Sequence, residues 1–263
     1  MTAHPPKSPL SSRPIVGFLG PLGTGKTEIA INYSLASLAA GRPTCLIDFD
    51  VVTPYFRAGA YREQLAARGL HVIAAPGSLA GFETPALSPE IAAALHDPDL
   101  HVVLDIGGDP EGARLLGTYS PAISARGCDL WMVANPFRPD VSARDLAQQR
   151  RLIEDTSGLH ITGLVANPNL GPLTDRSHLA SGWQSIKRTA EQLHLPVPFH
   201  LELGAGRGVP GVSGALRVVA LEDPIDLLRP MDTPLLLDRP VLDDVYRRLG
   251  GDERDEVHPL EVR

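Results

Sequence analysis

The segment Gly20-Pro21-Leu22-Gly23-Thr24-Gly25-Lys26-Thr27 decides the fold, because it follows an apolar run and opens a helical pattern. Its spacing satisfies G-x-x-x-x-G-K-[ST], the loop that cradles nucleoside triphosphates. Gly20, Gly23 and Gly25 let successive backbone N–H groups curl around the β-phosphate, and the following helix presents its positive end to the same anion. The pattern arises by chance in about one chain in a hundred of this size. A Gly-rich turn without a ligand is therefore the weaker interpretation.

The polar side chains of this loop predict both a nucleotide and a metal. Lys26 bridges β- and γ-phosphate oxygens and neutralises charge that grows on the leaving group, and Thr27 supplies a hydroxyl to Mg²⁺. Thr24 and the three glycines complete the expected phosphate contacts. We expect ATP as the nucleotide. No N-K-x-D guanine motif is visible in the sequence, but its absence is weak evidence, and GTP stays an alternative.

Alternating apolar runs and helical patterns from Pro14 to about Leu203 are typical of a parallel sheet flanked by helices. They predict one doubly wound α/β domain, residues 14–250, with about seven strands. The expected strands are Ile15–Leu19, Thr44–Phe49, His71–Ala74, His101–Ile106, Leu130–Ala134, Ile161–Ala166 and Val197–Leu201. The expected helices are a first one that stops at Gly41, then Pro54–Ala67, Val141–Glu154 and His178–Leu193.

The two ends of the chain carry no core pattern. Residues 1–13 are rich in Pro and Ser and lack the apolar stretch of a signal peptide, which predicts a disordered leader and a cytoplasmic protein. Residues 251–263 are charged and predict a frayed acidic tail.

Composition excludes several classes of function. The net charge of −7 argues against a standing nucleic-acid surface. No stretch reaches the roughly 18 uncharged apolar residues of a membrane span, and the acidic C-terminal region would be repelled by anionic lipid, so no membrane anchor is expected. The only two cysteines, Cys45 and Cys128, lie in apolar runs and are expected to be buried, inert thiols.

Two further predicted strands end in carboxylates. Cys45 to Asp50 ends in Asp48-Phe49-Asp50, and Val102 to Gly108 carries Asp105 followed by two glycines. Ligands bind at the carboxyl edge of such sheets, so both endings should lie beside the phosphate loop. Asp105 fits a carboxylate on the metal's water shell, and Gly108 could approach the γ-phosphate through its N–H. Either ending alone could be a turn cap.

These three segments together resemble the CobQ/CobB/MinD/ParA clan of SIMIBI-class P-loop ATPases. Asp48 to Arg57 and Asp105 to Asp109 further resemble an ATP-binding subgroup of that clan. The resemblance covers most of residues 14–203. It implies that Asp50 lies in switch I and orients the attacking water, that Asp48 supports Mg²⁺, and that Asp105 opens switch II.

One position departs from the dimerising branch of that clan. Its members carry a second lysine five positions before the P-loop lysine, and that lysine reaches into the partner's site. Here the position is Pro21. Activation in trans by this lysine is therefore impossible, and we do not expect nucleotide-driven dimerisation.

Three other features have divided interpretations. Asn167 ends a predicted strand where the clan often places a base-reading Asn, but a turn-forming Asn competes equally, and Asn135 is a weaker case. Arg57, in the first turn of a predicted helix, opposes the helix dipole, so its partner is either a nearby carboxylate or a phosphate or substrate. The Gly-rich stretch 204–214 contains G-x-G-x-x-G but lacks the following βαβ unit, so a loop near the adenine is preferred.

The sequence leaves three functions open. The first is a Mg²⁺-dependent slow ATPase that acts as a switch read by a protein partner. The second is a small-molecule enzyme of the dethiobiotin synthetase or cobyrinate amidase type, in which ATP activates a small carboxylate substrate. Members of that branch also lack the extra lysine. The third is a non-catalytic nucleotide sensor, which the retained acidic residues make the weakest.

Overall fold

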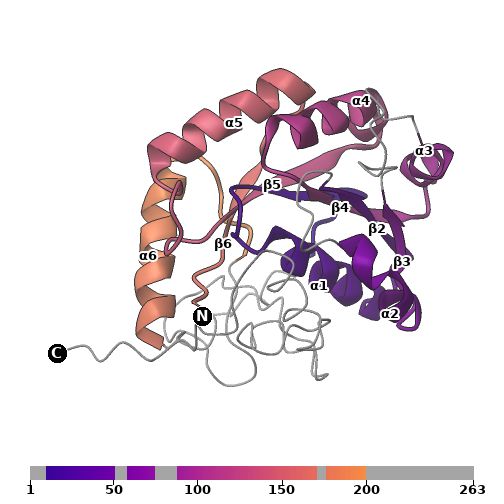
Figure 1. Ribbon diagram of the computed structural model, residues 1–263, viewed down its shortest axis with the longest axis horizontal. Helices are drawn as coiled ribbons and strands as arrows, with labels where there is room; N and C mark the ends of the chain where they lie inside the picture. The colour runs from indigo at the N-terminus through magenta and orange to yellow at the C-terminus, as the bar shows by residue number, and fades with distance from the viewer. Residues whose placement is uncertain (1–9, 51–57, 75–87, 171–175, 200–263) are drawn as a thin grey trace, which may run out of the picture.

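A computed structural model of the chain describes residues 10–50, 58–74, 88–170 and 176–199. Its centre is a parallel six-stranded sheet with the order β3-β2-β4-β1-β5-β6 (Figure 1). The strands are β1 Ile15–Leu19, β2 Thr44–Phe49, β3 His71–Ala74, β4 His101–Ile106, β5 Cys128–Ala134 and β6 Gly163–Ala166. The predicted doubly wound α/β fold is confirmed.

The seventh predicted strand, Val197–Leu201, is not formed in the part of it that the structure describes, residues 197–199. This segment does run beside β6, because Leu164 N donates a hydrogen bond of 2.9 Å to Pro196 O. Pro196 and Pro198 have no N–H group to donate, so a regular ladder cannot continue along the segment.

Helices cover both faces of the sheet (Figure 1). They are α1 Lys26–Ala39, the 3₁₀ turn η1 Ala58–Tyr61, α2 Arg62–Ala66, α3 Pro89–His96, α4 Pro110–Arg126, α5 Ala143–Ser157 and α6 Arg176–Leu193. In Figure 1, α1 and α2 lie on one face, α3, α4 and α5 lie on the other, and α6 lies beside the β6 edge. No helix in the described ranges combines the length and the apolar character that a bilayer crossing requires.

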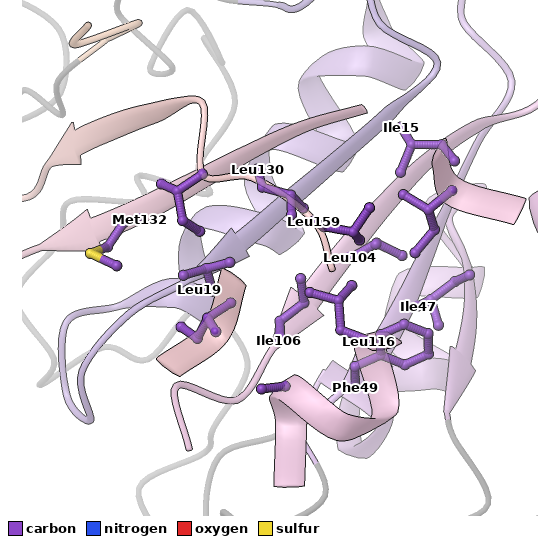
Figure 2. Packing of buried hydrophobic residues seen from close by; sticks show 14 of the residues in the cluster. Ile15, Leu19, Ile47, Phe49, Leu104, Ile106, Leu116, Leu130, Met132 and Leu159 are labelled. Atoms are coloured by element: carbon purple, nitrogen blue, oxygen red, sulfur yellow. The ribbon is translucent and has the colours of Figure 1, made fainter. Parts of the chain in front are cut away.

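Strand alternation divides the core between the two faces. On the α4 side, β1 contributes Ile15 and Leu19 to a cluster with Leu104, Ile106 and Leu130 among its members (Figure 2). Gly17 points to the same side, where a Cβ would lie 2.6 Å from Leu130 Cδ2 and 2.9 Å from Ile106 Cδ1. The missing side chain therefore lets its neighbours close over the centre of the sheet.

The other face packs α1 against the sheet through aromatic rings. Phe18 makes edge contacts with Tyr33, Trp131 and Phe199 at centroid distances of 5.3, 5.7 and 6.3 Å. All four rings are at least 95% buried. Aromatic pairs of this geometry add about 0.5 to 1.5 kcal/mol each beyond burial. They fix α1, and with it the start of the helix that follows the phosphate loop.

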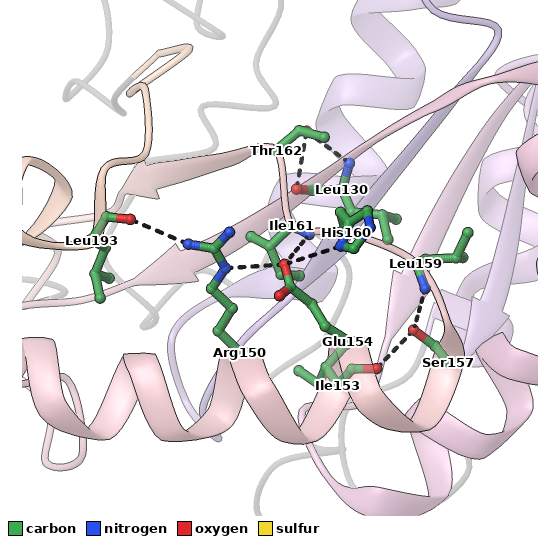
Figure 3. Close-up of polar contacts among 10 residues, drawn as sticks. All are labelled: Leu130, Arg150, Ile153, Glu154, Ser157, Leu159, His160, Ile161, Thr162 and Leu193. Carbon is green, nitrogen blue, oxygen red and sulfur yellow. Dashed lines mark hydrogen bonds and ion pairs between the residues drawn. The ribbon is translucent and has the colours of Figure 1, made fainter.

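Polar contacts join α5 to the end of α6 and to the segment that leads into β6 (Figure 3). Glu154 pairs with Arg150 at 3.0 Å and accepts a hydrogen bond of 2.8 Å from Ile161 N. Arg150 also donates to Leu193 O at 3.2 Å, which ties α5 to the end of α6. This pair is only partly exposed, so solvent screens it less than a surface pair.

Residues 10–13, the part of the expected leader that the structure describes, contact the amino edge of the sheet. Ser11 Oγ donates to Asp129 at 2.5 Å, Ser11 N donates to Tyr33 Oη at 2.6 Å, and Arg42 donates to Ser11 O at 2.6 Å. These contacts lie at the sheet edge opposite the phosphate loop.

Candidate functional site

The phosphate loop lies at the topological switch point of the sheet. The chain leaves β1 toward α1 on one face and leaves the adjacent β4 toward α4 on the other. The two connections therefore diverge, and ligands bind in the crevice that such a divergence opens at the carboxyl edge. The loop after β1 carries Gly20 to Gly25, and the loop after β4 carries Gly107 to Asp109.

The amino end of α1 has no side-chain cap. Gly25 is its N-cap in the left-handed region, with φ of 89°, and no side chain accepts from the first turn. In contrast, α3, α4 and α5 are capped by Ser88, Asp109 and Ser142. Uncapped N–H groups at a helix start, together with the helix dipole, favour an anion.

Two glycines of the loop are required by close contacts. At Gly20, with φ of 146°, a Cβ would overlap Val133 O, so the loop leaves β1 directly against β5. At Gly25, a Cβ would lie 2.5 Å from Nδ2 of Asn167. Asn167 donates from that nitrogen to Thr24 O at 2.7 Å. The residue that follows β6 is therefore hydrogen-bonded to the phosphate loop.

Lys26 lies folded back over the loop. Its Nζ donates to Pro21 O at 3.1 Å, and the same carbonyl accepts from Thr24 Oγ1 at 2.8 Å. The lysine is 6% exposed. Burial lowers its pKa, while the charges of Asp105, Asp50 and Asp109 oppose that shift. The charges of these three carboxylates therefore act on the ammonium, which contacts the loop that is expected to hold the phosphates.

Strand alternation places Asp48 and Asp105 on the α1 side of the sheet, directly opposite each other in the register of β2 and β4. Asp50 N donates to Asp48 Oδ1 at 3.1 Å, which fixes the end of β2. All three carboxylates are at least 96% buried. The expected convergence of the two acidic strand ends is thus present in the structure.

Asp105 is fully buried, and neither of its carboxyl oxygens has a hydrogen-bond partner of regular geometry among the described residues. Burial raises its pKa to about 8, the negative charge of Asp48 adds to the rise, and the nearby Thr27 hydroxyl and Lys26 oppose it. A buried carboxylate without donors is a costly group unless a cation or bound water approaches it.

The donor set at this edge fits Mg²⁺. No group of three or more His, Cys, Asp or Glu residues in the described ranges could enclose a metal ion. Mg²⁺ rarely uses such a cage, because it keeps several waters and binds one or two carboxylates together with substrate phosphates. The Thr27 hydroxyl and the Asp48 and Asp105 carboxylates offer that kind of set.

The loop after β4 packs directly on the phosphate loop. A Cβ on Gly108 would overlap Gly20 O, so only glycine permits this approach. Gln149 of α5 donates to Gly108 O at 2.8 Å. Asp109 then caps α4 by accepting from Glu111 N and Gly112 N at 2.9 and 3.0 Å. A shift of the loop after β4 must therefore displace the phosphate loop, and the reverse also holds.

The structure gives Asn135 and Asn167 structural contacts that the sequence did not specify. Asn135 Oδ1 accepts from Phe137 N at 3.0 Å, and its Nδ2 donates to Asn169 O at 2.8 Å. Asn167 uses its nitrogen on Thr24, while its Oδ1 is buried without a partner in the described part of the chain. A base contact by Asn167 stays a prediction, and that oxygen is available to make it.

Two residues beside the loops were not among the expected site residues, namely Gln149 and Arg138. Gln149 lies in an ordinary amphipathic helix, and nothing in its spacing indicates a contact 41 residues away in the sequence. Arg138 follows the Asn135-Pro136 turn, which the sequence did indicate. Arg57 and the stretch 204–214 lie outside the described residues.

Comparison with known proteins adds structural likeness only. No protein-family model matches the chain, and no curated protein matches it. Among solved structures, the cell division protein FtsY of Thermotoga maritima is 17% identical, with a TM-score of 0.47 over 82% of this chain and 68% of that one. The 54 kDa signal recognition particle protein of Aeropyrum pernix, in complex with GDP, is 18% identical, with a TM-score of 0.44 over 94% of this chain and 50% of that one.

FtsY of Mycoplasma mycoides is 15% identical, with a TM-score of 0.45 over 73% of this chain and 60% of that one. The chain thus spans between half and about two thirds of the length of these three proteins. At such identities and TM-scores, the likeness carries no inference about ligand or activity.

Proposed function

We propose that this chain binds Mg²⁺-ATP, hydrolyses it slowly, and acts as a nucleotide-dependent switch of the MinD/ParA-like kind for a protein partner. The observation that carries the proposal is a convergence at one sheet edge. Lys26 and Thr27, in the first turn of an uncapped helix, face the buried carboxylates of Asp48 and Asp105 at the ends of two adjacent strands.

Each group has a role in hydrolysis. Lys26 would leave Pro21 O for the β- and γ-phosphate oxygens, and Thr27, Asp48 and Asp105 would hold Mg²⁺ and its waters. Mg²⁺ supplies charge neutralisation on the phosphates. Asp50 orients a water that attacks the γ-phosphorus. The bond from that phosphorus to the bridging oxygen breaks, its electron pair leaves with ADP, and the products are ADP, inorganic phosphate and one proton.

The switch follows from the contact between the two loops. Gly108 touches Gly20 so closely that a γ-phosphate contacting the Gly108 N–H would shift both loops together. Gln149 transmits that shift to α5 through its hydrogen bond to Gly108 O. A protein partner that contacts α5 or these loops would then distinguish the triphosphate state from the diphosphate state.

A second function keeps the same nucleotide site but replaces the protein partner with a small carboxylate that ATP activates. Pro21 favours it, because this branch of the resembling clan also lacks the second lysine. A non-catalytic sensor is a third possibility, which slow turnover would contradict. The turnover measurement described below also compares ATP with GTP.

The experiment compares thermal stability with and without Mg²⁺-ATP for the wild-type protein and for Lys26→Ala. At a hundredfold excess over Kd, binding should stabilise the wild type by about 2.7 kcal/mol. Lys26→Ala should lose this stabilisation and still unfold cooperatively, since the amine contacts the loop rather than the hydrophobic core. A variant that Mg²⁺-ATP stabilises as much as wild type would overturn the proposal.

Turnover then separates the two functions. Phosphate release is measured alone and with a panel of small carboxylates, and GTP is tested beside ATP. Large stimulation by one carboxylate supports the small-molecule enzyme. Uniformly slow turnover supports a switch that awaits a protein partner.

A further inference from the structure

Arg138 lies beside the phosphate loop, although it comes 115 positions after Gly23. Its Nε is 3.9 Å from the point that a Cβ on Gly23 would occupy. Both residues are exposed, so the guanidinium lies on the solvent side of the loop rather than beneath it. Lys26 approaches the loop from its buried side. Two cations therefore lie next to the first half of the loop, Lys26 at Pro21 O and Arg138 at Gly23.

A well-anchored turn holds Arg138 in place. Arg138 N donates to Asn135 O at 3.0 Å, which closes a β-turn with Asn first and Pro second, the preferred residues at these positions. Asn135 is 2% exposed and is tied to Phe137 N and Asn169 O. Phe137 packs edge-on against His178 of α6, with ring centroids 5.6 Å apart. The turn is therefore anchored at Asn135 and Phe137, and the Arg138 side chain extends from it.

The guanidinium has no hydrogen bond or ion pair to any residue in the described part of the chain. This leaves all five of its donors available. Gly20 to Gly25 contribute no charged side chain to the loop, and Pro21 and Leu22 have no polar side-chain atom. Leu22 is 78% exposed. Arg138 is thus the cation that the described structure places on the open side of the loop.

We propose that Arg138 contacts the terminal phosphate of the bound nucleotide and makes the site prefer a triphosphate over a diphosphate. This inference rests on the proposed function. Gly23 lies in the half of the loop that begins at Gly20, the residue that Gly108 contacts. The γ-phosphate is expected at that contact, whereas Gly25 leads into the helix start that is expected to hold the β-phosphate. A planar guanidinium can bind two phosphate oxygens at once, and it neutralises charge that grows during transfer.

The test measures Kd for Mg²⁺-ATP and Mg²⁺-ADP, together with turnover, for wild type, Arg138→Ala, Arg138→Lys and a control. The control is Arg144→Ala, which removes an exposed arginine with no polar contact to a described residue, six positions away in α5. Arg138→Ala should weaken ATP binding by about tenfold or more and ADP binding by less than about threefold, the loss expected for one hydrogen bond to a charged group.

Turnover of Arg138→Ala should fall by at least the same factor, because an arginine at the transferring phosphate acts mainly in the transition state. Arg138→Lys keeps the positive charge but not the planar guanidinium. Its ATP affinity and turnover should lie between those of wild type and Arg138→Ala. Arg144→Ala should match wild type in both Kd values, and all variants should melt together without nucleotide.

Equal weakening of ATP and ADP by Arg138→Ala would overturn the inference, since the contact would then not be to the terminal phosphate. Unchanged affinity and turnover would overturn it as well. The wild-type measurement keeps the two proposals apart. If wild type binds neither nucleotide, the proposed function fails before Arg138 is tested. If wild type binds GTP instead, the same comparison is made with GTP and GDP.

Discussion

At the scale of single residues, Asp105 shows how the site trades stability for ligand binding. A carboxylate surrounded by protein, beside Asp48 and with no hydrogen bond of regular geometry in the described part of the chain, costs free energy in the nucleotide-free state. Mg²⁺ and its waters would supply the missing positive charge. Asp105 therefore lowers the stability of the protein without Mg²⁺, and bound Mg²⁺ would offset that cost.

This cost should depend on pH. The Asp105 pKa is raised from 3.8 to about 8 in the folded state. Between these values the folded state binds more protons than the unfolded state, so the free energy of unfolding falls as pH rises through this window. One unit of pKa shift corresponds to about 1.4 kcal/mol. Asp105→Asn should therefore stabilise the nucleotide-free protein by at least about 1 kcal/mol at pH 8. The gain should shrink toward pH 4.

Denaturant unfolding at pH 4.5, 6 and 8, without nucleotide or Mg²⁺, measures this gain. Asp99→Asn is the control, because it removes an exposed carboxylate from the turn before β4. A stability difference for Asp105→Asn that does not grow with pH would contradict the prediction. The same variant should lose Mg²⁺-dependent nucleotide binding.

Asp50 should matter for turnover more than for affinity. A carboxylate that positions water acts mainly in the transition state. Asp50→Asn should bind Mg²⁺-ATP nearly as well as wild type and release phosphate at least about tenfold more slowly. Single-turnover kinetics and equilibrium binding check both halves. Equal loss of binding and turnover would make Asp50 a structural or metal-site residue instead.

At the scale of elements, the sequence predicted the strands better than the helices. Apolar runs ended by polar residues identified all six strands, because parallel strands are buried on both faces. Strands β1, β2, β3 and β4 have the predicted bounds, whereas β5 begins two residues earlier and β6 two residues later than predicted. The predicted helix Val141–Glu154 begins at Ala143, after its Ser142 cap.

Two helices, α3 and α4, were not predicted. Each begins with a proline after a capping residue, Ser88 or Asp109, and α4 also contains Pro121. Proline at the first helical position is favourable, but a chain rich in Pro obscures that signal. The predicted helix Pro54–Ala67 is described only from residue 58, where a 3₁₀ turn precedes α2.

The contact between the loops after β1 and β4 makes a prediction about packing. Gly108→Ala places a methyl group onto Gly20 O, and neither backbone can move without disturbing the phosphate loop. We expect a loss of about 3 kcal/mol in unfolding free energy and loss of nucleotide-induced stabilisation. Thermal melts with and without Mg²⁺-ATP measure both effects.

The matched control is Gly158→Ala at the end of α5. Gly158 has φ of 71° and open space around it, so alanine adds backbone strain of about 1 kcal/mol and no clash. It should leave nucleotide binding unchanged. If Gly108→Ala lowers the unfolding free energy no more than Gly158→Ala does, the loops after β1 and β4 are not in the close contact described.

At the scale of the whole molecule, the site is assembled from the ends of five strands, β1, β2, β4, β5 and β6. The sequence could indicate the loop after β1 and the acidic ends of β2 and β4, because each carries its own chemistry. It could not indicate that Asn167 supports Thr24 across 143 positions, or that Arg138 faces Gly23. These contacts follow from the order of the strands, which places β5 beside β1 and β6 beside β5.

The last prediction concerns assembly, and it follows from Pro21. In the dimerising branch of the resembling clan, a lysine at this position crosses to the partner's nucleotide, so bound ATP holds the subunits together. Proline has no charge and no N–H, and here its carbonyl is already occupied by Lys26 and Thr24 within the chain. We therefore expect no ATP-induced change from monomer to dimer, even in Asp50→Asn, where slow turnover preserves the triphosphate. Sedimentation with and without Mg²⁺-ATP measures this directly. A doubling of mass with ATP that Arg57→Ala abolishes would show that Arg57 replaces the lysine in trans, and would return the protein to the dimerising switches.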